Sequence, residues 1–299
     1  MQLYLKTRTD PSDWSIGRAV LQAQMDSTPS LRPDEVCPGT IYYKNDCIKL
    51  DTIEKAAPLW GVKWEPTEGQ LVGHSGLLWR RPKQARCEGT VDFLHKFSSG
   101  ATKQPYISLF SSRDKSADWY RLFRSWCEIW RPYVGFAMSD CRWDRFDSET
   151  IDELGNFPRR PDGPYSDLKI GYLPWCLFLG EEFAAWMDAP ALRADGFSVE
   201  DVSGGHLLRI TDQPPYTEPQ FRKFHEARER AMAHFHPMLR KKRRQYYGNL
   251  ATDPKDHWKF NVWEDYDPRT GRSPPPRTHV NGPRDWAETP LTEEELKYR

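Results

Sequence analysis

The chain has 299 residues, long enough to bury a substantial core in one large domain or two small ones. Its 43 basic and 43 acidic side chains cancel, so no global field would draw it to nucleic acid or an anionic membrane. The N-terminal sequence has no basic-then-apolar signal pattern, and the apolar runs are too short to span a bilayer. We therefore expect a soluble, cytoplasmic protein with no membrane partner.

The first hundred residues mix short β-prone runs with turns. LYLKT, residues 3–7, predicts a strand, and IYYKNDCIKL, residues 41–50, predicts a hairpin that turns at Asn45. Asp51 then caps a predicted short helix that ends before Gly61.

The middle of the chain carries the strongest helical pattern. YISLF, residues 106–110, predicts a strand, and Ser116 is positioned to cap the helix that follows. Apolar side chains recur at steps of three and four down one face of this helix: Trp119, Leu122, Phe123, Trp126, Ile129 and Trp130. Pro132 ends the helix, and residues 133–138 predict the next strand.

The last regular elements lie between residues 170 and 235. IGYLPWCLFL, residues 170–179, predicts a strand, and Gly204 and Gly205 supply the turn of a hairpin. Thr217 and Gln220 form a capping box at the start of a second amphipathic helix.

Together these patterns predict an α+β fold with a mostly antiparallel sheet, helices packed on it, and an irregular Pro-rich C-terminal tail. We expect an N-terminal extension or lobe over residues 1–100, an α+β core over 101–245, and a tail over 246–299 that docks on the body. The 13 tryptophans predict a core rich in aromatic side chains.

Cysteine usage points to reduced thiols. The six cysteines contain no Cys-x-x-Cys pair and follow no secretion signal: Cys37, Cys47, Cys87, Cys127, Cys141 and Cys176. A disulfide framework is therefore not expected.

Ser75 is the nearest approach to a catalytic nucleophile. Gly73-His74-Ser75-Gly76 resembles the Gly-x-Ser-x-Gly elbow of hydrolases, but Leu77 stands where the second glycine belongs. An ordinary turn is the favoured interpretation, so we expect no catalytic residue and no enzyme activity. A serine hydrolase that uses Ser75 is the alternative.

Neither a metal nor a cofactor is expected. His225, His234 and His236 cluster, but their spacings of nine and two do not place two ligands on one helix face. The sequence has no Gly-rich phosphate loop and no dinucleotide fingerprint.

A basic run, Arg240–Arg244, precedes Tyr246 and Tyr247. Such a run can contact nucleic-acid phosphates, and a small nucleic-acid-binding protein is a further alternative. Cations at a helix C-terminus also complement the helix dipole, which is the favoured interpretation, so direct nucleic-acid binding is not expected.

A long loop over residues 140–167 follows the predicted strand at residues 133–138, and its first half is acidic with interleaved aromatic and basic residues. Interface anchors are typically Trp, Tyr and Arg, and negative charge suits a basic partner. We predict a partner-binding role for nine of its residues: Asp140, Arg142, Trp143, Asp144, Arg145, Asp147, Glu149, Asp152 and Glu153.

Four consecutive segments resemble the immunity protein 52 family of bacterial polymorphic-toxin and type VI secretion systems. They are PYISLFSS, DWYRLFRSWCEIWRPYVGFAMS, LKIGYLPWCLFLG and FSVEDVSGGHLLRITDQPPYTEPQFRKFHEARERAM, and the resemblance covers about residues 102–236. The Trp130-Arg131-Pro132 stop and the segment from Gly204 to Asp212 match most closely.

The resemblance implies a cognate immunity protein that binds and neutralises a secreted toxin. Members of the family often neighbour effectors with a restriction-endonuclease-like domain, so the implied partner is a DNase whose cleft or DNA surface is blocked. No catalytic residue is implied, and the oligomeric state stays open.

Overall fold

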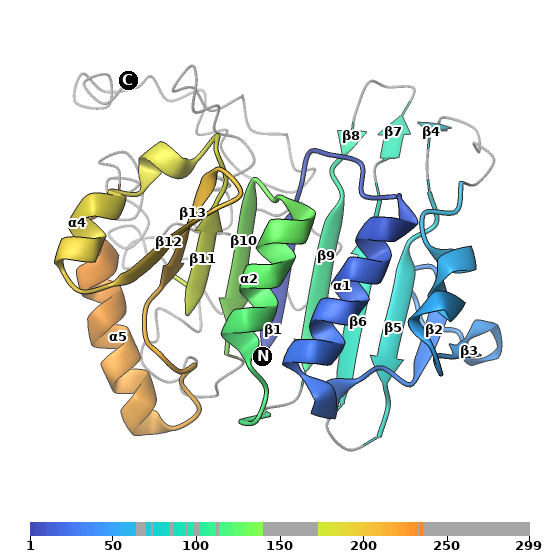
Figure 1. Ribbon diagram of the computed structural model, residues 1–299, viewed down its shortest axis with the longest axis horizontal. Helices are drawn as coiled ribbons and strands as arrows, with labels where there is room; N and C mark the ends of the chain where they lie inside the picture. The colour runs from blue at the N-terminus through green and yellow to red at the C-terminus, as the bar shows by residue number, and fades with distance from the viewer. Residues whose placement is uncertain are drawn as a thin grey trace, which may run out of the picture. The chain divides into compact units, whose positions relative to one another are not determined.

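A computed structural model describes residues 1–63, 70–72, 74–83, 86–93, 95–97, 102–111, 114–139, 173–232 and 234–235 (Figure 1). The chain forms two compact units. The first contains residues 1–140, 174–184 and 198–216, and the second contains residues 141–173, 185–197 and 217–299.

The first unit contains a ten-stranded sheet in which the neighbouring strands pair antiparallel, with the order β12-β13-β11-β10-β1-β9-β6-β5-β2-β3. A second sheet has the order β4-β7-β8. The strands are β1 (Gln2–Lys6), β2 (Glu35–Pro38), β3 (Ile48–Lys49), β4 (Gln70–Val72), β5 (Leu77–Arg81), β6 (Cys87–Asp92), β7 (His95–Phe97), β8 (Thr102–Lys103), β9 (Tyr106–Ser111), β10 (Val134–Met138), β11 (Cys176–Leu179), β12 (Ser198–Val202) and β13 (Gly205–Arg209). The predicted α+β class with a mostly antiparallel sheet is confirmed.

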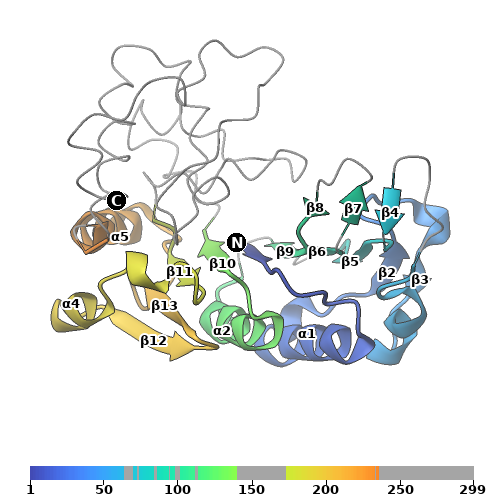
Figure 2. The same ribbon diagram turned by 90° about the horizontal axis from the view of Figure 1, so that it is seen from above.

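The α-helices are α1 (Trp14–Ser27), α2 (Trp119–Trp130), α4 (Ala189–Ala194) and α5 (Glu218–Met232). Short 3₁₀ turns are η1 (Pro29–Leu31), η2 (Lys44–Asp46), η3 (Ile53–Leu59) and η5 (Ala184–Trp186). Helices α1 and α2 lie side by side on one face of the ten-stranded sheet (Figure 2). No helix in the described ranges has the length and apolar content needed to cross a membrane.

The core beneath α1 and α2 is rich in aromatic side chains, as predicted. The indole of Trp79 on β5 meets the indole of Trp126 on α2 edge to face, with ring centroids 6.5 Å apart. Trp126 also donates from Nε1 to the carbonyl of Val20 on α1 at 3.1 Å, so helix and sheet share one packed interior. Gly89 on β6 leaves room for this arrangement, because a Cβ there would lie 2.1 Å from the Trp79 ring.

Helix α2 confirms the predicted amphipathic pattern but begins with a different cap. Asp118 accepts from the amide of Arg121 at 3.0 Å and is the N-cap. The predicted cap, Ser116, lies outside the helix, where its amide and hydroxyl both donate to Asp114. At the other end Arg131, the residue before Pro132, has a left-handed φ of 46° and closes the helix.

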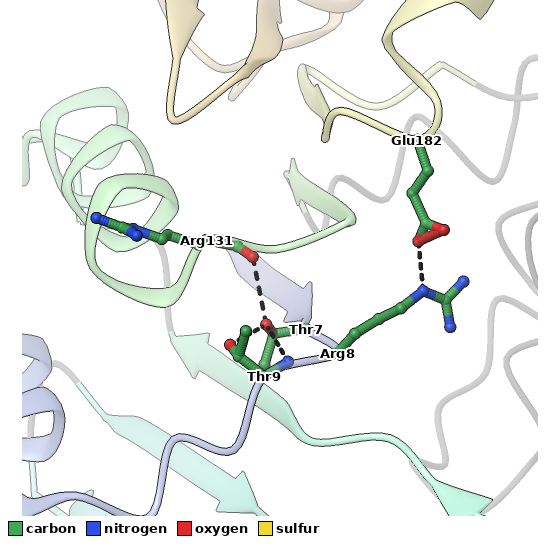
Figure 3. Close-up of polar contacts among 5 residues, drawn as sticks. All are labelled: Thr7, Arg8, Thr9, Arg131 and Glu182. Atoms are coloured by element: carbon green, nitrogen blue, oxygen red, sulfur yellow. Dashed lines mark hydrogen bonds and ion pairs between the residues drawn. The ribbon is translucent and has the colours of Figure 1, made fainter.

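The end of α2 is tied to the end of β1 (Figure 3). The hydroxyl of Thr7 donates to the carbonyl of Arg131 at 3.2 Å, and the amide of Thr9 donates back to the Thr7 hydroxyl at 3.2 Å. The next side chain, Arg8, forms an ion pair with Glu182 beyond β11. These contacts hold the left-handed residue in place.

Two local predictions for residues 1–63 are wrong, and one helix was not predicted. The hairpin over residues 41–50 does not form, because β3 pairs with β2 and not with the preceding residues. The helix expected from Asp51 is the 3₁₀ turn η3, which Thr52 precedes. Helix α1, capped by Asp13, was not predicted.

The predicted reduced state of all cysteines is also wrong. Cys37 and Cys47 form a disulfide. Cys87, Cys127 and Cys176 are buried free thiols.

In the second unit, α4 and the chain after α5 are joined by backbone and side-chain contacts. The amide of Asp188 donates to the carbonyl of His234 at 2.9 Å, and Met187 forms a β-bridge with Phe235. In the capping box of α5, the amide of Thr217 donates to Oε1 of Gln220 at 3.1 Å.

Candidate partner-binding surface

The nine residues predicted to bind a partner all lie outside the described residues. They are Asp140, Arg142, Trp143, Asp144, Arg145, Asp147, Glu149, Asp152 and Glu153. Their role stays a prediction. The basic run Arg240–Arg244 also lies outside the described ranges.

Ser75 lies two residues before β5. Its amide donates to the carbonyl of Val62 at 2.8 Å, which fastens this residue to the preceding segment. The neighbouring His74 is 3 % exposed and meets Phe93 edge to face, with ring centroids 6.0 Å apart. Among the described residues no hydrogen bond joins Ser75 to a histidine or a carboxylate, and Nδ1 of His74 has no partner. A base positioned to activate Ser75 is therefore not visible in this part of the chain.

His234 has a structural contact. Its Nε2 lies 2.9 Å from Oδ2 of Asp195, within the second unit. His236 and the side chain of His225 lie outside the description. In the described ranges no group of three or more His, Cys, Asp and Glu side chains could hold a metal ion.

Exposed apolar side chains gather in one short segment of the first unit. In the part of the chain that the structure describes, five large apolar side chains are exposed: Ile41 (62 %), Tyr43 (59 %), Ile48 (40 %), Val62 (41 %) and Phe110 (53 %). Three of the five lie within eight consecutive residues, 41–48. Single exposed apolar side chains are ordinary, but a cluster is typical of an interaction site.

The Cys37–Cys47 disulfide closes a ring that contains Ile41 and Tyr43 but not Ile48, and we call this ring the disulfide loop (residues 37–47). Gly39 has a φ of +78°, which favours glycine, and its amide donates to the carbonyl of Gly76 at 2.7 Å. At the far side of the loop the amide of Asp46 donates to the carbonyl of Tyr43 at 3.1 Å. The loop is thus fastened at its base and within its tip.

A stacked side chain anchors the middle of the disulfide loop to the sheet. The guanidinium of Arg80 on β5 lies over the Tyr42 ring at 3.8 Å from its centroid. Arg80 is held in turn by Glu35 on β2, with Nε 3.0 Å from Oε1. Because Tyr42 is half-buried against Arg80 while Ile41 and Tyr43 on either side are exposed, the loop presents its apolar groups from a fixed base.

The charges on the disulfide loop are few and mixed. Lys44 and Asp46 are exposed within the loop, and Lys49 follows on β3 with an ion pair to Asp51 at 3.1 Å. The surface is therefore suited to an apolar contact with a polar rim, the usual anatomy of a protein interface. It is a poor match for a nucleic-acid backbone, which requires clustered positive charge.

The sequence contained a signal for this loop. Two cysteines ten residues apart enclose a turn flanked by Ile41, Tyr42 and Tyr43. The pattern predicts a hairpin with reduced thiols because no secretion signal precedes it, and Cys spacing does not reveal the backbone geometry that a disulfide requires.

Comparisons with known proteins add a fold-level likeness. No family model matches the chain, and no curated protein matches it in sequence. Among solved structures, it is similar to the Pseudomonas aeruginosa T6SS protein PA0821, at 15 % sequence identity and a TM-score of 0.43. The match covers 77 % of this chain and 72 % of that one. A likeness of this size carries no conclusion about function.

Proposed function

We propose that this chain is an immunity protein that binds and neutralises a cognate secreted toxin, with the disulfide loop as one anchor of the complex. Two lines of support meet in this proposal. The segments that resemble the immunity protein 52 family coincide with β9, α2, β10, β11, the β12-β13 hairpin and α5. The observation that carries a binding role is the placement of Ile41 and Tyr43 on a fastened loop.

The proposed binding energy comes from burying apolar side chains on a loop that needs little further ordering. Covering an exposed Tyr or Ile side chain contributes about 1.5–3 kcal/mol, and aromatic residues dominate interface energetics. Ordering a mobile interface side chain costs about 0.5–1.5 kcal/mol. The Cys37–Cys47 bond and the Arg80–Tyr42 stack already hold this loop in place. The cost of ordering it on binding is therefore smaller.

The proposed partner is the nuclease toxin that the family resemblance implies, and the proposed action is steric. A bound immunity protein covers the active cleft or the DNA-binding surface of the toxin. No catalytic step by this chain is needed, because tight binding alone keeps the toxin from its substrate.

Co-expression with the toxin encoded beside this chain tests the proposal. The wild-type chain should restore growth and co-purify with the toxin. Tyr43→Ala should weaken the complex by roughly 30- to 140-fold in Kd, measured by calorimetry with a catalytically inactive toxin, since about 2–3 kcal/mol of burial is lost.

Val62→Ala is the matched control, because Val62 is an exposed apolar residue outside the disulfide loop. It should leave Kd within about threefold of the wild-type value. If the wild-type chain neither restores growth nor binds the toxin, the proposed function is wrong.

A further inference from the structure

One row of side chains runs straight across six strands of the ten-stranded sheet. The registers pair Gln2 with Phe110, Phe110 with Glu88, Glu88 with Arg80, Arg80 with Glu35, and Glu35 with Lys49. We call these six residues the cross-strand row. The row begins on the central strand β1 and ends on β3, next to the disulfide loop.

The cross-strand row faces away from α1 and α2. Side chains alternate between the two faces of a strand, and Trp79, the neighbour of Arg80, points to the helices. Its indole donates to Gln24 of α1 at 2.8 Å and meets the Trp126 ring of α2. Both helices lie on that one face (Figure 2), so the row belongs to the other.

Phe110 is the unusual member of the row. It lies on β9, an interior strand, between a buried Leu109 and a buried Ser111, and yet its side chain is 53 % exposed. Its cross-strand neighbour Glu88 is also exposed. Within the described residues Glu88 has no ion pair, so an exposed aromatic ring and an available carboxylate lie side by side.

The charges of the row alternate in sign from Glu88 to Lys49. Its two central members, Arg80 and Glu35, neutralise each other at 3.0 Å and are each only about a quarter exposed or less, at 20 % and 25 %. The outer members are open, with Lys49 83 % exposed. A partner therefore meets a neutral centre, a negative charge beside Phe110, and, beside the disulfide loop, a Lys49 ammonium that is paired with Asp51.

The row and the disulfide loop fit within a single interface. Neighbouring strands lie about 4.8 Å apart, so Phe110 lies about 14 Å from Glu35 across three spacings, and the whole row spans about 24 Å. A standard interface buries about 800 Å² on each partner, which corresponds to a patch of similar width. Tyr42 also packs on Arg80, a member of the row, so the loop and the row are continuous.

We propose that the cross-strand row forms the second half of the toxin-binding surface, with Phe110 as its anchor. The inference rests on the proposed function. The fitting partner is a protein face with an apolar pocket for Phe110 and a Lys or Arg side chain opposite Glu88. The exposed cations of a DNA-binding surface provide the second feature.

Two variants test the row, with the purified inactive toxin encoded beside this chain as the probe. Phe110→Ala should raise Kd at least tenfold, through faster dissociation, while Phe110→Leu should retain most of the affinity. Glu88→Lys should slow association at least fivefold at low salt and reduce the dependence of the association rate on ionic strength, because it reverses the charge that faces the partner's cation.

Glu181→Lys is the matched control for charge. Glu181 is exposed, has no ion pair in the described part of the chain, and lies outside the row, so the same change in net charge should leave association unchanged. Thermal unfolding of each variant confirms that the fold is intact.

The results distinguish a failure of the cross-strand row proposal from a failure of the proposed function. If Tyr43→Ala weakens binding while Phe110→Ala and Glu88→Lys bind like wild type, the row is not part of the interface and the proposed function stands. If the wild-type chain does not bind the toxin, the proposed function is wrong, and the role of the row in toxin binding is wrong with it.

Discussion

Glu200 on β12 is held by two hydrogen bonds from α2. Its carboxylate accepts from the hydroxyl of Tyr120 and from Nε of Arg124, both at 2.7 Å, and Arg209 lies over the Tyr120 ring. Partial burial alone would raise the pKa of Glu200, but the hydrogen bonds from Arg124 and Tyr120 and the nearby positive charges outweigh it and lower the pKa. Burial is the main reason that the pKa of Tyr120 is raised, and the hydrogen bond to the Glu200 carboxylate raises it further.

Glu200→Gln should therefore make stability less dependent on pH. A carboxyl with a lowered folded pKa stabilises the protein above its unfolded pKa of about 4.3, and this contribution is lost as pH falls through the folded pKa. The variant should lose on the order of 1 kcal/mol of unfolding free energy near pH 7 and less near pH 3, measured by urea denaturation. Glu181→Gln should show no such difference, and an equal loss at both pH values would contradict the ionic explanation.

Some residue-scale features could not be predicted from the sequence. Gln24 is fully buried on α1, where its amide accepts from Trp79 and donates to the carbonyl of Leu31 at 3.2 Å. The buried face of α1 also includes Gly17, which lies against Trp60. Because that face holds a glycine and a glutamine, its apolar period is weak, and the helix escaped prediction.

At the scale of elements, a strong local pattern in the sequence was sufficient to predict a helix or a turn. The spacing of apolar residues in α2 predicted a helix whose Trp119, Leu122 and Trp126 are buried, and Gly204 predicted the β12-β13 turn, where its φ is +80°. Elements that depend on distant partners were not predictable. Residues 41–50 have a β-prone composition, but the strand that β3 joins lies earlier in the chain, at Glu35–Pro38.

The disulfide loop is the element on which the proposed binding role rests. Reduction of Cys37–Cys47 by a dithiol such as dithiothreitol yields two thiols and the oxidised reagent. It should lower the free energy of unfolding by about 2–3 kcal/mol, because the unfolded chain regains the entropy of an open loop. Urea denaturation with and without the reductant measures this loss, and Cys37→Ser should reproduce it.

The other described cysteines serve as an internal control. Burial raises the pKa of the Cys87 thiol to about 11, and burial also raises the pKa of Cys127 and Cys176. These thiols should resist alkylation in the native protein. If alkylation without reductant labels both Cys37 and Cys47, the disulfide is absent. The cytoplasmic location stays a prediction. Disulfides are typical of oxidising compartments, so the Cys37–Cys47 bond does not support it.

At the scale of the whole molecule, the sheet is assembled from distant segments. Residues 1–100 supply five of the ten strands: β1, β2, β3, β5 and β6. β1 lies between β9 and β10, so Gln2 pairs with Phe110 on one side and Met138 on the other. A hydrophobic pattern identifies a strand but not its partners, which is why the sequence suggested an N-terminal extension or lobe.

Removing residues 1–100 should therefore prevent the remainder from folding alone. The deletion takes away β1 and β6, so β9 loses both neighbours and β10 keeps only β11, and the open backbone groups promote aggregation. Fragment 101–299 should lack a cooperative thermal transition by circular dichroism, and co-expression with fragment 1–100 should restore one. A cooperative transition of the isolated fragment at the wild-type temperature would show instead that residues 1–100 form a separate lobe. The pairings of β1 on both sides favour the first result, because no other described strand lies between β9 and β10.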